Sequence, residues 1–495
     1  MKKWELWGKK LHGTQKCCTF ACSMMILLTI VCYFSLLYVV SRWTGRRATN
    51  EAFYRAERRS PWPMVAFGMV GASISGVTFV SVPGMVQQSQ MTYLQVCLGF
   101  VVGYVLVALV LLPLYYRLNL TSIYAYLGQR LGRRSYLSGA WFFLLSKMTG
   151  AAAKFYVVCM ILQQFVFDGL RVPFWANVAG LVLLIWLYTH RGGIKTLVVT
   201  DTVQTVCLFT VLLLIIYKVV GELGLSASET VQTVANSPMS RVFVFDDWMS
   251  RQNFWKQFLS GVFIVVVMTG LDQDMMQKNL TCKTLREAQK DMCSYGVAFV
   301  PVNLLFLSLG VLLTMSGVEA RGDDLLPLYV QGASGIRCLF VLGVVAASFS
   351  TADSALTSMT TSYCVDVCQR PDDEHLRRRV HVAMCLVFVL FILLFRYANS
   401  TSLLDAIYIM VSYTYGPLLG LFAFGLFTHR QPNDKWTPYI CVASPLLCYG
   451  MDLLAQTLWG YHFGYELLMF NGLLTFAGLW ISSRCTPLAA CQTPS

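Results

Sequence analysis

The chain has 495 residues, of which 56% are hydrophobic and only 13% are charged. A soluble domain would carry about a quarter charged residues, and many apolar runs here reach about twenty residues, the length that crosses a bilayer. This composition excludes a soluble globular domain and predicts a polytopic membrane protein whose surroundings are a lipid bilayer.

The net charge of +13 does not indicate nucleic acid as a partner, because the basic residues are confined to loops between apolar segments. Such loops carry the charges that orient membrane proteins. Cys282, Cys293, Cys364 and Cys368 form no C-x-x-C pair, so neither a zinc site nor a disulfide framework is favoured.

The apolar segments predict an all-α polytopic membrane protein with about thirteen transmembrane helices. No A-x-A cleavage site follows the first segment, so it is predicted to span the membrane rather than to be a signal peptide. The predicted spans are 20–41, 64–89, 93–116, 137–167, 174–189, 194–220, 254–274, 286–315, 335–365, 378–396, 402–428, 436–456 and 463–483.

Alternate loops are rich in arginine and lysine, which places them on the cytoplasmic side of the cell (inner) membrane. The N-terminus is then predicted outside and the C-terminus in the cytoplasm. Five lysines in the first 16 residues disagree with this orientation, so the orientation of the first span stays open. The basic loops are residues 42–59, 117–134, 191–195, 278–290 and 370–379, and the long loop 221–253 is predicted to be external.

The second span carries glycines, hydroxyls and a proline at its centre, between Gly68 and Gly84. A helix interrupted there exposes backbone carbonyls, which a membrane tolerates only where they line a cavity or bind an ion. An ordinary Pro/Gly kink is the alternative. The density of Ser and Thr beside the break favours a site.

Ionisable side chains mark two further spans. Lys147 and Lys154 lie seven residues apart on one face of the span 137–167, which predicts either an anion-binding surface or ion pairs with Asp201 or Asp353. Asp201 enters the span 194–220 one helical turn before Gln204. A buried acid in a span indicates function, and a structural salt bridge is the alternative.

The stretch 344–356 is apolar but carries four hydroxyls and a carboxylate. Ala347, Ser350, Thr351 and Ser354 fall on one face of a helix, with Asp353 at its edge. A hard cation held by oxygens would satisfy this face, and small-residue helix packing is the alternative.

The segment 270–290 combines an acidic span end with a basic segment. A membrane-surface amphipathic helix would explain the basic part. Asp272 and Gln273, at the inner end of the span, are predicted to gate an inner vestibule.

Taken together, these segments resemble the sodium:solute symporter family over residues of about 50–430. The most specific matches are Gly192-Gly193 through Asp201 to Gln204, and the run Ser350-Thr351-Ala352-Asp353-Ser354. The resemblance implies a leucine-transporter-like inverted repeat of five plus five helices. It divides the chain into an extra N-terminal helix with a basic loop (1–62), a first repeat (63–220), an external loop (221–253), a second repeat (254–428) and extra C-terminal helices (429–495).

The resemblance also implies a sodium site that joins two carbonyls of the first core helix to a carbonyl and two hydroxyls of the eighth. A second cation site of some relatives corresponds to Asp201, Asp353 and Ser354 in this chain, where Asp353 replaces a serine. The implied ligands of the first site are the carbonyls of Gly71, Ile74 and Ala347 and the hydroxyls of Ser350 and Thr351.

For the substrate, the resemblance implies a midplane site that includes Ser73, Ser75 and Thr78. Related sialic-acid transporters place an arginine near Gly150, where this chain has Lys147 and Lys154 instead. A lysine gives a point charge without the bidentate fork of arginine. Sialic acid, a sugar and a monocarboxylate all remain candidates.

The predicted function is a monomeric, Na⁺-coupled symporter that imports a small polar solute by alternating access. The alternatives are a proton-coupled symporter of the same fold and a membrane solute sensor. An enzyme or a nucleotide-driven pump is not predicted, because the spans carry no H-E-x-x-H motif or Ser/His pair and the chain has no P-loop.

Overall fold

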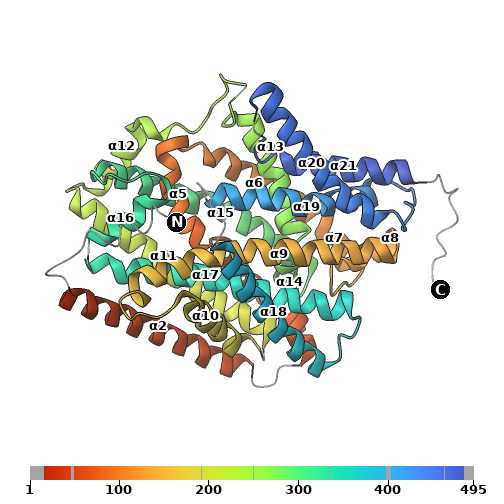
Figure 1. Ribbon diagram of the computed structural model, residues 1–495, viewed down its shortest axis with the longest axis horizontal. Coiled ribbons are helices and arrows are strands. Elements are labelled where there is room, and N and C mark those ends of the chain that lie inside the picture. Colours follow the sequence, from red (N-terminus) through yellow and green to blue (C-terminus); the bar gives the residue numbers. More distant parts are fainter. Residues whose placement is uncertain are drawn as a thin grey trace.

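The computed structural model describes residues 16–45, 49–190, 192–248, 250–332, 334–396, 403–461 and 463–483, and these form a helical bundle (Figure 1). The principal helices are α2 (Lys16–Thr44), α4 (Trp62–Ser73), α5 (Gly76–Ser89), α6 (Tyr93–Leu106), α7 (Leu112–Arg117), α9 (Arg133–Leu162), α10 (Phe174–Thr189), α11 (Gly193–Glu222), α13 (Phe254–Val265), α14 (Gln273–Asn279), α15 (Leu285–Met315), α17 (Ser334–Ser362), α18 (Glu374–Phe395), α19 (Leu403–Phe427), α20 (Thr437–Trp459) and α21 (Leu467–Ser482). Shorter helices in the connections are α3 (Asn50–Arg55), α8 (Ala125–Arg130), α12 (Ala227–Asn236) and α16 (Leu325–Gly332).

The predicted class, an all-α polytopic membrane protein, is confirmed. Among the described residues, nine helices are long and apolar enough to cross a bilayer, or eleven if each of two bent pairs is one span. Two shorter apolar helices, α10 and α21, lie at the predicted spans 174–189 and 463–483. Because these two are short, the total of thirteen spans stays a prediction.

Two helices are broken inside the bundle. α4 and α5 meet at 63°, and α13, extended to Gly270, meets α14 at 70°. At the first break Ile74 has φ −86° and ψ 98°, and the Ser75 hydroxyl caps α5 by accepting from the Thr78 backbone N–H at 3.4 Å. The predicted interruption is present, but Pro83 lies well inside α5, so serine capping and not the proline accompanies the break.

α17 is the helix around which the others pack. In the apolar stretch of this helix 83% of the residues are buried, whereas 22% to 61% are buried in the apolar stretches of the other long helices. It contacts α4, α5, α9 and α11, and Figure 1 shows it near the centre of the bundle. The hydroxyl-rich face predicted for 344–356 therefore faces other helices and not lipid.

α4 packs closely on α11 through two glycines. A Cβ added at Gly68 would lie 3.1 Å from the Asp201 Cβ, and one added at Gly71 would lie 1.9 Å from the Thr205 Oγ1. The Thr205 hydroxyl is itself fixed, since it donates to the Asp201 carbonyl at 2.6 Å. The structure therefore has no room for an alanine side chain at Gly71.

We expect Gly71→Ala to destabilise the protein by about 1–3 kcal/mol, the usual cost of overpacking a tight contact. The measurement is the thermal unfolding midpoint in detergent. Gly180→Ala is the matched control, because a Cβ there would have no atom within 4 Å. Equal midpoints for the two variants would contradict the close α4–α11 contact.

Candidate functional site

Backbone and side-chain oxygens converge between the end of α4 and the middle of α17. The Thr351 hydroxyl donates to the Ala72 carbonyl at 3.0 Å and to the Ala347 carbonyl at 3.2 Å. The expected carbonyl partner on α4 was that of Gly71, one residue earlier, but the Gly71 carbonyl accepts from the Ile74 N–H at 3.2 Å. The structure therefore adds Ala72 to the expected set.

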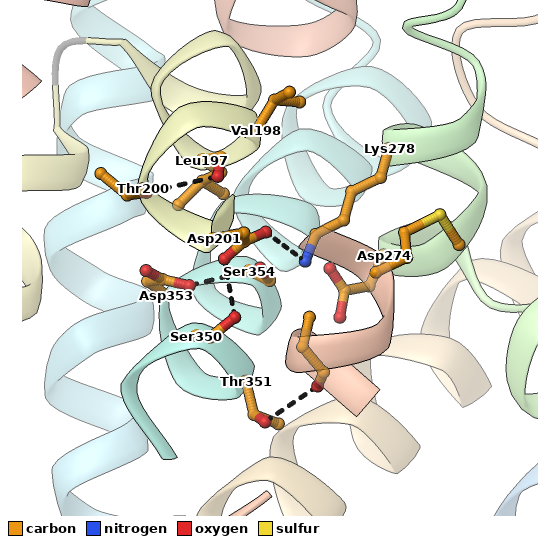
Figure 2. A network of polar contacts seen from close by, with 12 residues as sticks. Leu197, Val198, Thr200, Asp201, Asp274, Lys278, Ser350, Thr351, Asp353 and Ser354 are labelled. Atoms are coloured by element: carbon orange, nitrogen blue, oxygen red, sulfur yellow. Dashed lines mark hydrogen bonds and ion pairs between the residues drawn. The ribbon is translucent and has the colours of Figure 1, made fainter. Parts of the chain in front are cut away.

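The Ser350 hydroxyl, on the same face of α17, donates to Oδ1 of Asp201 at 2.7 Å. The other carboxylate oxygen, Oδ2, lies 2.7 Å from the ammonium of Lys278, which reaches in from α14 (Figure 2). The side chains of Lys278 and Asp201 are only 2% and 1% exposed. The pair is therefore a buried salt bridge in direct contact with the predicted sodium ligands.

A second carboxylate lies beside this pair. Asp353 accepts from the Tyr188 hydroxyl at 2.7 Å and from the Ser354 hydroxyl at 3.2 Å. It is fully buried, and Figure 2 shows it next to Asp201. The three residues expected from the second cation site, Asp201, Asp353 and Ser354, are thus brought together.

Oxygen donors dominate this site. Among the described residues, no cluster of three or more His, Cys, Asp or Glu could hold a metal ion. Carbonyls, hydroxyls and carboxylates are hard donors, which suits an alkali cation better than a transition metal.

A cavity lies directly against the oxygen cluster. It is bordered by both breaks, because Ala72 and Ser73 line it at the first and Asp272 and Asp274 at the second. Thr351 lines it as well, so the cation site and the cavity share a wall. Other lining side chains are Tyr104, Lys147, Lys154, Tyr295 and Tyr415.

The two lysines of α9 differ in their partners. Lys147 bridges Asp272 at 3.1 Å and Asp274 at 2.7 Å, and the Tyr415 hydroxyl donates to Asp272 at 2.6 Å. The alternative of a pair with Asp201 or Asp353 is therefore wrong for Lys147, whose charge α14 already neutralises. Lys154 forms no ion pair with any residue that the structure describes.

The residues predicted to gate the inner side join three segments. Gln273 donates to the Thr121 carbonyl and accepts from the Ile123 N–H, both at 3.0 Å. Gln277, one turn later, donates to the Tyr54 carbonyl at 2.8 Å and the Thr361 hydroxyl at 3.0 Å. α14 therefore fastens the segments before α4 and α8 to the end of α17.

The expected substrate residues separate in the structure. Ser73 lines the cavity and hydrogen-bonds the Tyr295 hydroxyl. Ser75 and Thr78 are buried in the α5 cap, where the Thr78 hydroxyl accepts from the Ser75 N–H at 3.3 Å, and neither lines the cavity.

Sequence reasoning missed Lys278, Asp274 and Tyr188. Lys278 lies in the segment expected to be a basic surface helix, but six of the seven residues of α14 are buried. The spacing of Asp274 and Lys278, one helical turn apart, was the available signal. Tyr188 lies in a span without any charged side chain and gave none.

Two broken, membrane-spanning helices around an oxygen-lined centre define a polytopic membrane protein of the transporter type. The model of the sodium:solute symporter family matches residues 53–434, more than half of the chain, and the chain belongs to that family.

Curated relatives agree with this assignment. The human sodium/iodide cotransporter is 26% identical over 77% of this chain and 62% of its own length. The rabbit sodium-dependent multivitamin transporter is 26% identical over 83% of this chain and 67% of its own. The sodium/sialic acid symporter NanT of Aliivibrio fischeri is 24% identical over 81% and 83%. The chain thus spans roughly two thirds of the first two relatives.

Solved structures confirm the fold. A Na⁺-coupled sialic acid symporter in a substrate-bound outward-open state has a TM-score of 0.78 at 18% identity, covering 93% of this chain and 98% of that one. Mhp1, a nucleobase-cation-symport-1 family transporter, has a TM-score of 0.51 at 15% identity, covering 86% and 92%.

We expect Lys147→Met to destabilise the protein by about 3–5 kcal/mol, because it leaves two buried carboxylates without their cation. Thermal unfolding in detergent measures the effect. Lys154→Met on the same helix is the control and should unfold near the wild-type temperature. If both variants unfold together, the ion-pair network around Lys147 does not contribute as described.

Proposed function

We propose that the protein is a Na⁺-coupled symporter that imports a small anionic solute by alternating access. The observation that carries this proposal is the convergence of the Ala72 and Ala347 carbonyls with the Thr351 hydroxyl beside a helix break. Family membership supports the coupling ion. Sodium is a hard cation for which these oxygens are suitable ligands.

The proposed sodium site retains the predicted ligands, with the Ala72 carbonyl as the alternative to that of Gly71. They are the carbonyls of Gly71 or Ala72, Ile74 and Ala347 and the hydroxyls of Ser350 and Thr351. Ser350 connects this set to the carboxylate of Asp201, which supplies negative charge close to the ion without occupying the centre of the oxygens.

Coupling would arise from the wall that the two sites share. Ala72 and Thr351 belong to the oxygen set and also line the cavity. An ion bound there would fix the broken end of α4 and so preorganise the solute site, and by linkage the solute would tighten ion binding equally.

We propose that Lys154 holds the anionic group of the solute. Its ammonium lines the cavity without an ion pair in the described structure, whereas Lys147 is already neutralised. Ser73 and the hydroxyl of Tyr295 add hydrogen-bonding groups to the same cavity. Relatives named for iodide, sialic acid and monocarboxylate support an anion.

We further propose the topology predicted from the sequence, with repeats at 63–220 and 254–428, an N-terminus outside and a C-terminus in the cytoplasm of the cell (inner) membrane. The bent pairs α4/α5 and α13/α14 begin the two segments, as expected of an inverted repeat with broken first helices. α14, with Asp272 and Gln273, would then close the inner side, and the working unit would be a monomer.

The experiment that tests the proposed function is solute uptake by proteoliposomes, with iodide, sialic acid, monocarboxylates, hexoses and proline as the panel. We expect accumulation of an anion under an inward Na⁺ gradient and none with choline. Accumulation that follows a pH gradient and ignores Na⁺ would instead support a proton-coupled symporter, and binding without accumulation would support a sensor.

The double variant Ser350→Ala/Thr351→Ala should raise the Na⁺ concentration for half-maximal uptake by about 5- to 150-fold. Each lost hydroxyl removes an interaction of about 0.5–1.5 kcal/mol. Ser358→Ala is the control, because this buried serine of α17 donates only to its own helix at Ala355. Unchanged sodium activation in the double variant would refute the proposed ligands.

Lys154→Met should raise the KM of an anionic solute by about 10- to 100-fold, since a hydrogen bond to a charged group contributes about 1.5–3 kcal/mol. Lys154→Arg preserves the charge and should retain most of the affinity. The readout is initial uptake at saturating Na⁺. An unchanged KM in Lys154→Met would remove this lysine from the site.

A further inference from the structure

Three ionisable side chains are buried together behind the oxygen cluster. They are Asp201 on α11, Asp353 on α17 and Lys278 on α14, each at most 2% exposed. Lys278 contacts only one of the two carboxylates, Asp201, at 2.7 Å. Asp353 accepts instead from the hydroxyls of Tyr188 and Ser354.

Both carboxylate oxygens of Asp201 already have partners. Oδ2 lies 2.7 Å from the Lys278 ammonium, and Oδ1 accepts from the Ser350 hydroxyl at 2.7 Å. A second cation at Asp201 would have to displace this ammonium, and two positive charges side by side in a buried site repel one another.

We propose that the Lys278 ammonium takes the place of a second cation at Asp201, so that this chain binds one Na⁺ and not two. The inference rests on the proposed function and refines it. The acidic site formed by Asp201, Asp353 and Ser354 then holds a cation that is part of the protein.

The backbone around Lys278 is fixed, which makes this ammonium a built-in part of the site. The Lys278 carbonyl accepts from the Thr281 hydroxyl at 2.7 Å and from the Thr281 N–H at 3.0 Å. The next residue, Asn279, donates to Asp291 at 2.6 Å and to the Ala288 carbonyl at 3.1 Å. α14 is thereby tied to α15.

Besides Asp201, the carboxylate of Asp274 on α14 also faces the Lys278 ammonium. Figure 2 shows Asp274 beside the end of Lys278, and Asp274 is itself 2.7 Å from Lys147 in the cavity wall. Charges of alternating sign therefore run from the cavity to the cation site, in the order Lys147, Asp274, Lys278 and Asp201. This arrangement stabilises Lys278 as a cation and ties its position to the cavity.

The test counts bound ²²Na⁺ on purified full-length protein by scintillation proximity. We expect one ion per wild-type molecule with a Hill coefficient near one. Lys278→Gln exposes a second carboxylate and should bind two ions with a Hill coefficient above one. Lys278→Arg keeps the charge and should bind one.

Two further variants make the result specific. Lys278→Gln/Asp201→Asn removes both charges of the pair and should return the count to one. Lys283→Gln alters an exposed lysine five residues along the chain and should also bind one. Gel filtration identifies any variant that fails to fold. If Lys278→Gln does, Lys278→Met, which removes the charge and keeps a long flexible side chain, takes its place and should likewise bind two ions.

The outcomes separate this inference from the proposed function. One bound ion in both wild type and folded Lys278→Gln would overturn the inference and leave sodium coupling intact, as would two ions in wild type. No saturable ²²Na⁺ binding to wild type would overturn the proposed function itself.

Discussion

The hydrogen bond from Ser350 to Asp201, with the Lys278 ammonium on the other carboxylate oxygen, is the contact on which the centre of this molecule depends. It joins α17, α11 and α14, the second part of a broken helix, at one buried carboxylate. Gly68 allows α4 to pack closely on α11 at this point, because it lies against the Asp201 side chain. Removing either partner of such a pair leaves an uncompensated charge in a medium that cannot solvate it.

The proposed cation site and the cavity both border the break between α4 and α5. α4 ends at Ser73, where the Ala72 carbonyl accepts from Thr351 and Ser73 itself lines the cavity. The second break contributes carboxylates to the cavity wall, since Asp272 and Asp274 there bind Lys147 of α9. Ion and solute would thus act on the same few residues, which gives a physical route for coupling without a long pathway.

Much of this centre could be predicted from the sequence. Hydroxyls and acids within apolar spans need polar partners, so their positions in the sequence indicate a buried polar site. Helical spacing placed Ser350 and Thr351 on one face of a helix, and the family resemblance placed Asp201 beside that face. The sequence did not predict that the Ala72 carbonyl accepts from Thr351, since this depends on the residue at which α4 ends. Lys278 was hidden by its place after an apolar span, where basic residues normally face the cytoplasm, and only the 70° bend returns α14 to the bundle. Helical periodicity assigned Lys147 to a face but could not identify its neighbours.

The central claim is that solute and Na⁺ move together through these oxygens, and thermodynamic reciprocity offers the most direct measurement. Wild-type proteoliposomes would be given an inward gradient of the transported anion with equal Na⁺ on both sides, clamped voltage and a collapsed pH gradient. The account predicts transient uptake of ²²Na⁺ above its equilibrium level, driven by the solute alone. Entry of the solute while ²²Na⁺ stays at equilibrium would contradict it.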